Sequence, residues 1–172
     1  MKFCTKCGLK EHDNSAIFCK KCGNKLTSTK YFPKTREELD ELLDRHDVEY
    51  SEIDVSEITD MSYLFIQPKE SIFLPYNKSY HVLDKDTAGL IYWDVSNVKN
   101  MLGMFEEATS FNQPIGNWDV SNVENMTSMF ENATSFNQPI GNWNISNVKD
   151  RDNMFKNAIS FNQALEKWNT KI

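Results

Sequence analysis

The sequence predicts an α/β repeat solenoid that begins with a helical cap and is preceded by a small, separate metal-binding head. The first observation is a tryptophan that recurs every 25 residues through the second half of the 172-residue chain. The second is a pair of Cys-x-x-Cys motifs near the first residue, and the third is an amphipathic pattern between these motifs and the repeats. Together they divide the chain into a head at 1–26, a linker at 27–32 and a repeat body at 33–172.

The head is predicted to be a zinc ribbon, because all four cysteines lie in two Cys-x-x-Cys-Gly knuckles. Two residues between thiolates let both sulfurs of a tight turn face one ion, and the glycines supply the positive φ of the turn. Four thiolates in a closed tetrahedron select Zn²⁺ and predict a structural site; a rubredoxin-like iron centre and a redox dithiol pair are the alternatives. The head also resembles the short zinc ribbons at the N-termini of bacterial proteins. The predicted ligands are Cys4, Cys7, Cys19 and Cys22.

Charge is distributed unevenly between the head and the body. Residues 1–30 carry a net charge of +5, which leaves −11 for residues 31–172. A basic head is a candidate for binding nucleic acid. Four thiolates and one Zn²⁺ reduce its charge to about +3, and it has no arginine, so we expect a weak nucleic-acid footprint on a solvated lysine surface.

Composition excludes several classes of protein. With 12% aromatic and 26% charged residues, the chain has too many large apolar groups to be disordered throughout. It contains no apolar run of 18 residues, so we expect no membrane insertion. The first residues lack the apolar stretch of a signal peptide, and we therefore expect a cytoplasmic protein.

A capped helix is predicted over residues 36–45, at the start of the repeat body. Thr35 and Glu38 form a capping-box pattern, and three leucines follow at helical spacing. A lone helix of this length is marginal in water, so it must dock on a neighbour. We expect it to cover the open edge of the first repeat.

Four repeats account for the rest of the body. The second and third, 93–117 and 118–142, differ at only four of their 25 positions. A diverged first copy begins at Ile53, and an insertion at 66–92 separates it from the second copy. The fourth copy has Arg151 where the second and third have methionine, which a terminal repeat tolerates because no neighbour covers its outer face.

Each unit is predicted to contain a short strand, a short α or 3₁₀ helix and a turn. In the third unit Trp118 and Val120 alternate as in a strand, and the apolar residues from Val123 to Ala133 keep helical spacing. Stacked units would align their strands in parallel. The Asn-Gln pair repeated in each unit is either a binding ladder or a set of partners for backbone groups, and we expect the second role.

The repeated constellation Trp-Asp-Val-Ser-Asn-Val-x-Asn-Met-x-x-Met-Phe-x-x-Ala-x-x-Phe-Asn-Gln resembles the BspA-like leucine-rich-repeat surface proteins, whose units also occur in mycoplasma lipoproteins. The resemblance covers residues 33–172 and includes the helix before the first repeat. It implies a leucine-rich-repeat-like solenoid and a role in adhesion or protein interaction.

A non-enzymatic protein-protein interaction module is the function that these features favour, because four stacked units offer one face to an unidentified protein partner. The alternatives are a nucleic-acid-associated or regulatory protein that uses the zinc ribbon, and a surface adhesin as the resemblance implies. We expect no enzyme, since the chain has three histidines, no cysteine beyond the head and no phosphate-binding glycine loop.

The insertion at 66–92 supplies the candidate partner-binding residues, because aromatic groups on loops make good anchors for a partner. Alternatively, these rings pack the loop onto the first two units. The candidates are Phe73, Tyr76, Tyr80 and His81.

Overall fold

The computed structural model describes residues 30–45, 47–66, 81 and 87–168 in full, and the backbone of three short strands that precede them. Most of the described chain forms neither helix nor strand. The elements in these regions are β1 (Lys2–Cys4), β2 (Lys10–Glu11), β3 (Leu26–Ser28), α1 (Arg36–Leu43), η1 (Tyr50–Glu52), η2 (Thr87–Tyr92) and η3 (Glu166–Trp168), where η denotes a 3₁₀ helix.

The three strands form an antiparallel sheet in the order β2-β1-β3. The register places Cys4 opposite Leu26, which follows the last cysteine, Cys22, by four residues. The pairing therefore joins the chain at the two ends of the cysteine motif.

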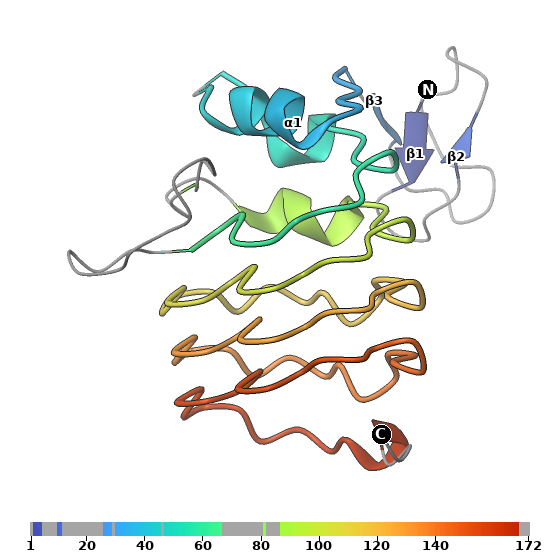
Figure 1. Cartoon of the computed structure of the whole chain (residues 1–172). Helices are drawn as coiled ribbons and strands as arrows, with labels where there is room; N and C mark the ends of the chain where they lie inside the picture. The colour runs from blue at the N-terminus through green and yellow to red at the C-terminus, as the bar shows by residue number, and fades with distance from the viewer. Residues whose placement is uncertain are drawn as a thin grey trace.

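The helix α1 confirms the cap predicted at the start of the body, although it ends two residues earlier than predicted, at Leu43. Thr35 is its N-cap, and the Thr35 hydroxyl accepts a hydrogen bond from the Glu38 N–H at 3.2 Å. The Glu38 carboxylate accepts from the Lys34 N–H at 2.7 Å instead of reaching back to Thr35. Leu39 and Leu43 are buried where α1 lies over one end of the stack (Figure 1).

Below α1 the chain winds through four coils that stack on one another (Figure 1). We call residues 53–66 with 87–92 coil 1, residues 93–117 coil 2, residues 118–142 coil 3 and residues 143–168 coil 4. Isolated parallel bridges join equivalent positions of successive coils, namely Asp60 with Asn100, Asn100 with Asn125, and Asn125 with Asp150.

The backbone within a coil differs from the predicted strand and helix. In coil 3, whose residues are all described, Trp118 and Val120 lie outside any strand, and the segment from Ser121 to Ala133 is a succession of turns. Ser128 and Asn132 have φ angles of +53° and +58°, which an α-helix does not allow. Turns and helices share an apolar spacing of three or four residues, so the pattern alone does not separate them.

Hydrogen bonds between coils explain why turns replace the helix. Alternate N–H groups close turns within the coil, as Met129 N does onto Met126 O at 3.2 Å. The other N–H groups donate to the next coil, as Phe130 N does to Met154 O at 2.9 Å. A helix would direct all of these donors along its own axis and leave the next coil without partners.

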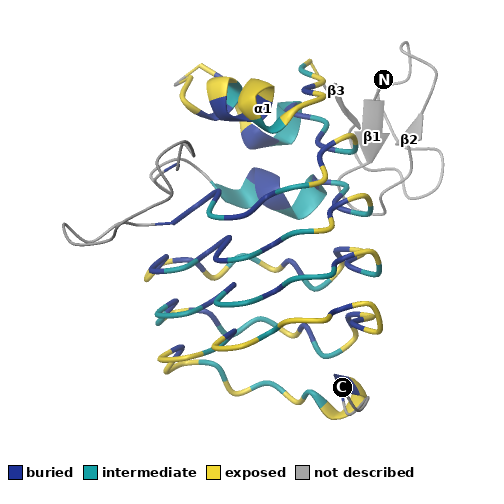
Figure 2. Ribbon diagram, viewed as in Figure 1, coloured by how far each residue is buried: buried dark blue, intermediate teal, exposed yellow. Residues whose placement is uncertain are grey.

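The core between the two sides of the coils is filled with methionine and aromatic side chains, which are buried along the stack (Figure 2). Phe105 stacks on Phe130 with 5.6 Å between ring centroids and an interplanar angle of 5°. Phe130 stacks in the same way on Phe155 at 5.7 Å. The buried methionines of this core are Met101, Met104, Met126, Met129 and Met154.

Side-chain amides form further ladders and confirm the backbone role predicted for the Asn-Gln pairs. The Asn112 side-chain oxygen accepts from Asn137 N at 2.9 Å, and Asn137 accepts from Asn162 N at 3.0 Å. Gln138 donates to the backbone oxygen of Asn112 at 2.9 Å. These amides satisfy turns that have no sheet partner.

The inserted segment is shorter than predicted, because η2 belongs to coil 1. Trp93 N donates to Leu90 O at 3.1 Å, just as Trp118 N donates to Ile115 O at 3.0 Å one coil later. Leu90 is fully buried, as is Ile115. Residues 87–92 thus replace 112–117 in coil 1, and the extra residues lie before Thr87.

Candidate functional site

Most of the predicted site residues fall outside the described residues. Of the four cysteines, only the backbone of Cys4 is described, as the last residue of β1. Cys7, Cys19 and Cys22 lie outside, and so do Phe73, Tyr76 and Tyr80. The zinc site and the aromatic anchors of the insertion therefore remain predictions.

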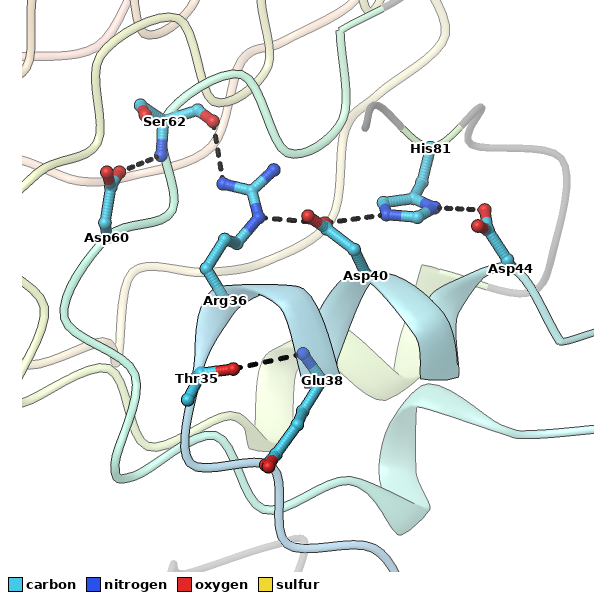
Figure 3. Close-up of polar contacts among 8 residues, drawn as sticks. All are labelled: Thr35, Arg36, Glu38, Asp40, Asp44, Asp60, Ser62 and His81. Carbon is cyan, nitrogen blue, oxygen red and sulfur yellow. Dashed lines mark hydrogen bonds and ion pairs between the residues drawn. The ribbon is translucent and has the colours of Figure 1, made fainter. Parts of the chain in front are cut away.

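His81, the described member of the partner-binding set, lies against α1 instead of in solvent. Its side chain is 4% exposed. Its Nε2 atom is 2.9 Å from Asp40 Oδ1 and its Nδ1 atom is 3.1 Å from Asp44 Oδ1 (Figure 3). This placement fits the alternative in which the insertion packs onto the body.

Arg36 extends the cluster toward coil 1. Its Nε donates to Asp40 Oδ1 at 2.8 Å, and its Nη1 donates to the backbone oxygen of Ser62 at 2.8 Å (Figure 3). Both Arg36 and Asp40 side chains are almost buried, at 10% and 12% exposure. The cluster thus joins three parts of the chain that are distant in sequence: α1, coil 1 and the end of the insertion.

We call Arg36, Asp40, Asp44 and His81, together with the Ser62 backbone oxygen, the clamp, because their contacts join α1 to coil 1 and to the end of the insertion. The buried His81 ring and the Arg36 guanidinium are held by direct hydrogen bonds to Asp40, and these contacts leave little access to a substrate. Within the described ranges, no group of three or more His, Cys, Asp or Glu side chains has the geometry to hold a metal ion.

The sequence gives a partial signal for the clamp. Arg36, Asp40 and Asp44 recur every four residues and so form one line along α1, beside the buried Leu39 and Leu43. The partner on the insertion could not be identified, because nothing in the local sequence of His81 points to a helix 41 residues earlier.

A second candidate site is the surface strip on which near-identical coils differ; we call it the variable strip. Six of its eight residues in coils 2 and 3 are exposed or half-buried, while Gly103 and Glu107 are buried. All of them fall in the segment that carries the hydrogen bonds between coils. The strip consists of Lys99, Leu102, Gly103 and Glu107 in coil 2, and Glu124, Thr127, Ser128 and Asn132 in coil 3.

Charges along this face form pairs between coils. A hydrogen bond from Lys149 lowers the pKa of Glu124, and the same contact raises the pKa of Lys149. Burial tends to raise the pKa of Glu131, but hydrogen bonds from Lys156 and Ser128 outweigh it and lower that pKa. Solvent screens the exposed Lys149–Glu124 pair, so we expect it to add little stability, whereas the Glu131 side chain that Lys156 contacts is only 12% exposed.

Glu106 differs from these paired carboxylates. Partial burial raises its pKa, and the nearby negative charges of Glu131 and Glu107 raise it further. The face thus places acidic groups of adjacent coils next to one another, with Lys156 as the neighbouring cation.

Comparison with known proteins connects this stack to a family. Residues 75–172, more than half of the chain, match the model of the family described as "Mycoplasma protein of unknown function, DUF285". The chain belongs to this family. The DUF285 match includes coils 2, 3 and 4 in full. No curated protein and no solved structure matches the chain.

The family description gives no activity, so any function must be argued from the DUF285 coils themselves. In the described part of the chain, no helix has the length and apolar character needed to cross a membrane.

Proposed function

We propose that this DUF285 protein is a non-enzymatic protein-protein interaction module and that the variable strip is its partner-binding face. The main support for this proposal is that coils 2 and 3 are identical at 21 of 25 positions and that all their differences lie on this strip. Positions that pack the aromatic and methionine core or form the Asn-Gln ladder repeat without change, because each coil must fit the next. On the strip, Asn132 donates to Glu107 and Lys149 donates to Glu124 between coils. The half-buried side chains of Leu102 and Thr127 belong to neither the core nor these ladders and are available for recognition.

The composition of the strip supports this role. Leu102 is half-exposed among charged neighbours, and Lys99 is followed one coil later by Glu124. An apolar group surrounded by charges of both signs is typical of a small protein interface. Phe73, Tyr76 and Tyr80 of the insertion remain proposed additional anchors for the same partner.

A paired-variant experiment tests the proposed face. The double variant Leu102→Asp, Thr127→Asp introduces aspartate at one equivalent position of coils 2 and 3. Coil 4 already has aspartate there, at Asp152, so the fold should tolerate both changes. Affinity capture from the source cell with this variant should lose the proteins that the unchanged chain retains.

The matched control for that capture adds the same charge elsewhere. Thr109→Asp with Ser135→Asp places two carboxylates on exposed positions outside the strip, and this chain should retain the partners. Equal retention by both variants, or no specific partner for the unchanged chain, would contradict the proposal.

We also propose that the head is a zinc ribbon with one structural Zn²⁺ on Cys4, Cys7, Cys19 and Cys22. Support comes from the four-thiolate donor set and from the strand pairing that joins the two ends of the motif. Elemental analysis should give one zinc per chain, and Cys7→Ser with Cys22→Ser should abolish it. An iron absorption spectrum would contradict the zinc assignment and favour a rubredoxin-like iron centre. Disulfides in protein purified without reductant would favour a redox dithiol pair.

The body is proposed to be a leucine-rich-repeat-like solenoid of the BspA-like kind, as the repeat motif resembles that family. We propose the cytoplasm as its compartment, where thiolates stay reduced for metal binding. Cell fractionation distinguishes this from the surface location of an adhesin.

A further inference from the structure

The main ladder consists of the N–H groups of residues 61–65, 101–107 and 126–132 that donate to the next coil, and its backbone hydrogen bonds run in one direction along the stack. At the start of this row the direction is reversed, since Lys99, Glu124 and Lys149 donate to Thr59, Lys99 and Glu124 of the coil before. Each coil donates N–H groups to carbonyl oxygens of the coil that follows it in sequence. Coil 3 donates to coil 4 from Met126, Ser128, Phe130 and Asn132, at 2.8 to 2.9 Å. Along the main ladder, the first end of the stack therefore presents acceptors and the last end presents donors.

The acceptor end is closed by α1 and the insertion. The carbonyls of Ser62 and Leu64 in coil 1 are equivalent to those of Leu102 and Met104, which accept from the preceding coil. Ser62 O accepts instead from the Arg36 side chain at 2.8 Å, and Leu64 O accepts from His81 N at 2.9 Å. The clamp of Figure 3 thus supplies the donors that a preceding coil would supply.

The donor end has no such closure among the described residues. The N–H groups of Arg151, Asn153, Phe155 and Asn157, equivalent to the four donors of coil 3, have no acceptor in that part of the chain. Figure 2 shows that coil 4 is much more exposed than the coils above it.

Aromatic surface accompanies these donors. Phe155 and Phe161 are half-buried, whereas Phe130 and Phe136 in coil 3 are fully buried. Phe161 stacks on Phe136 of coil 3 at 5.8 Å and on Phe155 of its own coil at 4.1 Å, and in the described chain neither Phe155 nor Phe161 stacks on a ring of a coil beyond coil 4. A hollow beside them is lined by Arg151, Asn153, Met154, Phe155, Lys156, Leu165 and Trp168.

The polarity of the ladder determines what can bind here. Two copies of this chain placed with their donor ends together would oppose N–H to N–H, which forms no hydrogen bond. The donor end of one copy also fails to pair with the acceptor end of another, because Arg36 and His81 already occupy those carbonyls. A second copy is therefore a poor occupant. A β-strand is also a poor match, since its edge alternates acceptors with N–H groups.

We propose that the coil 4 end is a docking surface for a coil of the same repeat type carried by a different polypeptide. Such a coil offers the carbonyl row of the main ladder, with the N–H groups that donate in the reverse direction at one end of the row, as coils 2, 3 and 4 do to the coils before them. It also offers rings at the spacing that covers Phe155 and Phe161. The surface is separate from the variable strip, so either proposal can fail alone.

Amide hydrogen exchange on the full chain tests this docking surface. The probe is a synthetic peptide of residues 119–143, which contains the carbonyl row of coil 3 and its two phenylalanines. With excess peptide, exchange at Arg151, Asn153, Phe155 and Asn157 should slow about tenfold or more, while interior donors such as Phe130 should not change. The same peptide with Phe130→Ser and Phe136→Ser should have no effect.

Three outcomes would overturn the proposal. One is unchanged exchange at the four amides with the peptide in millimolar excess. Another is equal slowing by the substituted peptide, since stacking would then be irrelevant. The third is slowing that depends on the concentration of the chain alone, together with a dimer in analytical ultracentrifugation, since the occupant would then be a second copy.

Discussion

At the scale of single residues, the coil spacing leaves no room for a side chain at two glycines. A Cβ at Gly116 or Gly141 would lie inside van der Waals contact of a backbone oxygen of the next coil, that of Pro139 or Ala164 respectively. Coil 4 has Glu166 at the equivalent position, and no described coil follows it. The loss of glycine in the last unit, visible in the sequence, thus has a steric cause.

Gly141→Ala should destabilise the protein by about 1–3 kcal/mol, because backbone of coil 4 must move to accept the methyl group. Urea unfolding monitored by tryptophan fluorescence measures the change. Glu166→Ala is the matched control and should stay within about 0.5 kcal/mol of the unchanged chain, since its side chain is exposed. Equal effects of the two variants would refute the steric explanation.

The two kinds of glutamate on the ladder face should give stability opposite dependences on pH. Burial raises the pKa of Glu106, so the folded state binds its proton more tightly and loses stability as the pH rises through that raised pKa. Glu106→Gln should therefore raise the thermal midpoint at pH 7 and have no effect near pH 3. Because the group is half-exposed, we expect about 0.5 kcal/mol or less.

Glu124 provides the comparison of opposite sign. The hydrogen bond from Lys149 lowers the pKa of Glu124. Its contribution to the stability of the fold is therefore present at pH values above the usual pKa of a glutamate and is lost as the pH falls through the lowered pKa. Glu124→Gln should lower the thermal midpoint at pH 7, again with no effect near pH 3. Calorimetry of both variants at the two pH values checks the signs, and midpoints shifted in the same direction at pH 7 would contradict the assignment.

At the scale of elements, α1 was predictable because its signals are local. Thr35 and the leucines that follow contain the information needed for a capped, one-sided helix. The turns of the coils were not predictable in this way. Their positive φ angles occur at residues such as Ser128 and Asn132, and their hydrogen bonds depend on a neighbouring coil 25 residues away.

The clamp between α1 and coil 1 predicts a specific cost for losing Arg36. Arg36→Met leaves Ser62 O without its donor and weakens the pairing of Asp40, so unfolding should require about 1.5–3 kcal/mol less. Chemical denaturation measures this loss. Lys34→Met changes an exposed cation two residues earlier and should be nearly neutral. A neutral Arg36→Met would show that α1 is held by its leucines alone.

At the scale of the whole molecule, contacts that repeat with the 25-residue period could be predicted from the sequence, whereas contacts between unrelated segments could not. The period and the number of units follow from the repeat, and the recurring apolar positions, among them Met101 and Phe130, are buried. For His81 the sequence left two roles open, a partner anchor or packing of the insertion, and its position between Asp40 and Asp44 depends on hydrogen bonds between residues that no local pattern connects. The cysteine site stays a prediction.

The division into head and body makes a prediction about metal removal. If zinc folds only the ribbon, a chelator should remove it without moving the unfolding midpoint of the repeat body by more than about 1 °C. Calorimetry before and after chelation measures the midpoint, and elemental analysis verifies the loss of zinc. A body that melts with the metal would show that the head and the coils form one cooperative unit.

The fixed direction of the ladder has a consequence for how such a chain can change over generations. Because successive coils repeat the same donors and acceptors on their upper and lower sides, a genetic duplication of 25 codons inserts a coil that fits both neighbours at once. The loss of one period is accommodated in the same way. The length of the stack can therefore change in whole steps while both ends remain as they are, and coils 2 and 3, identical at 21 of 25 positions, are what a recent step of this kind would leave.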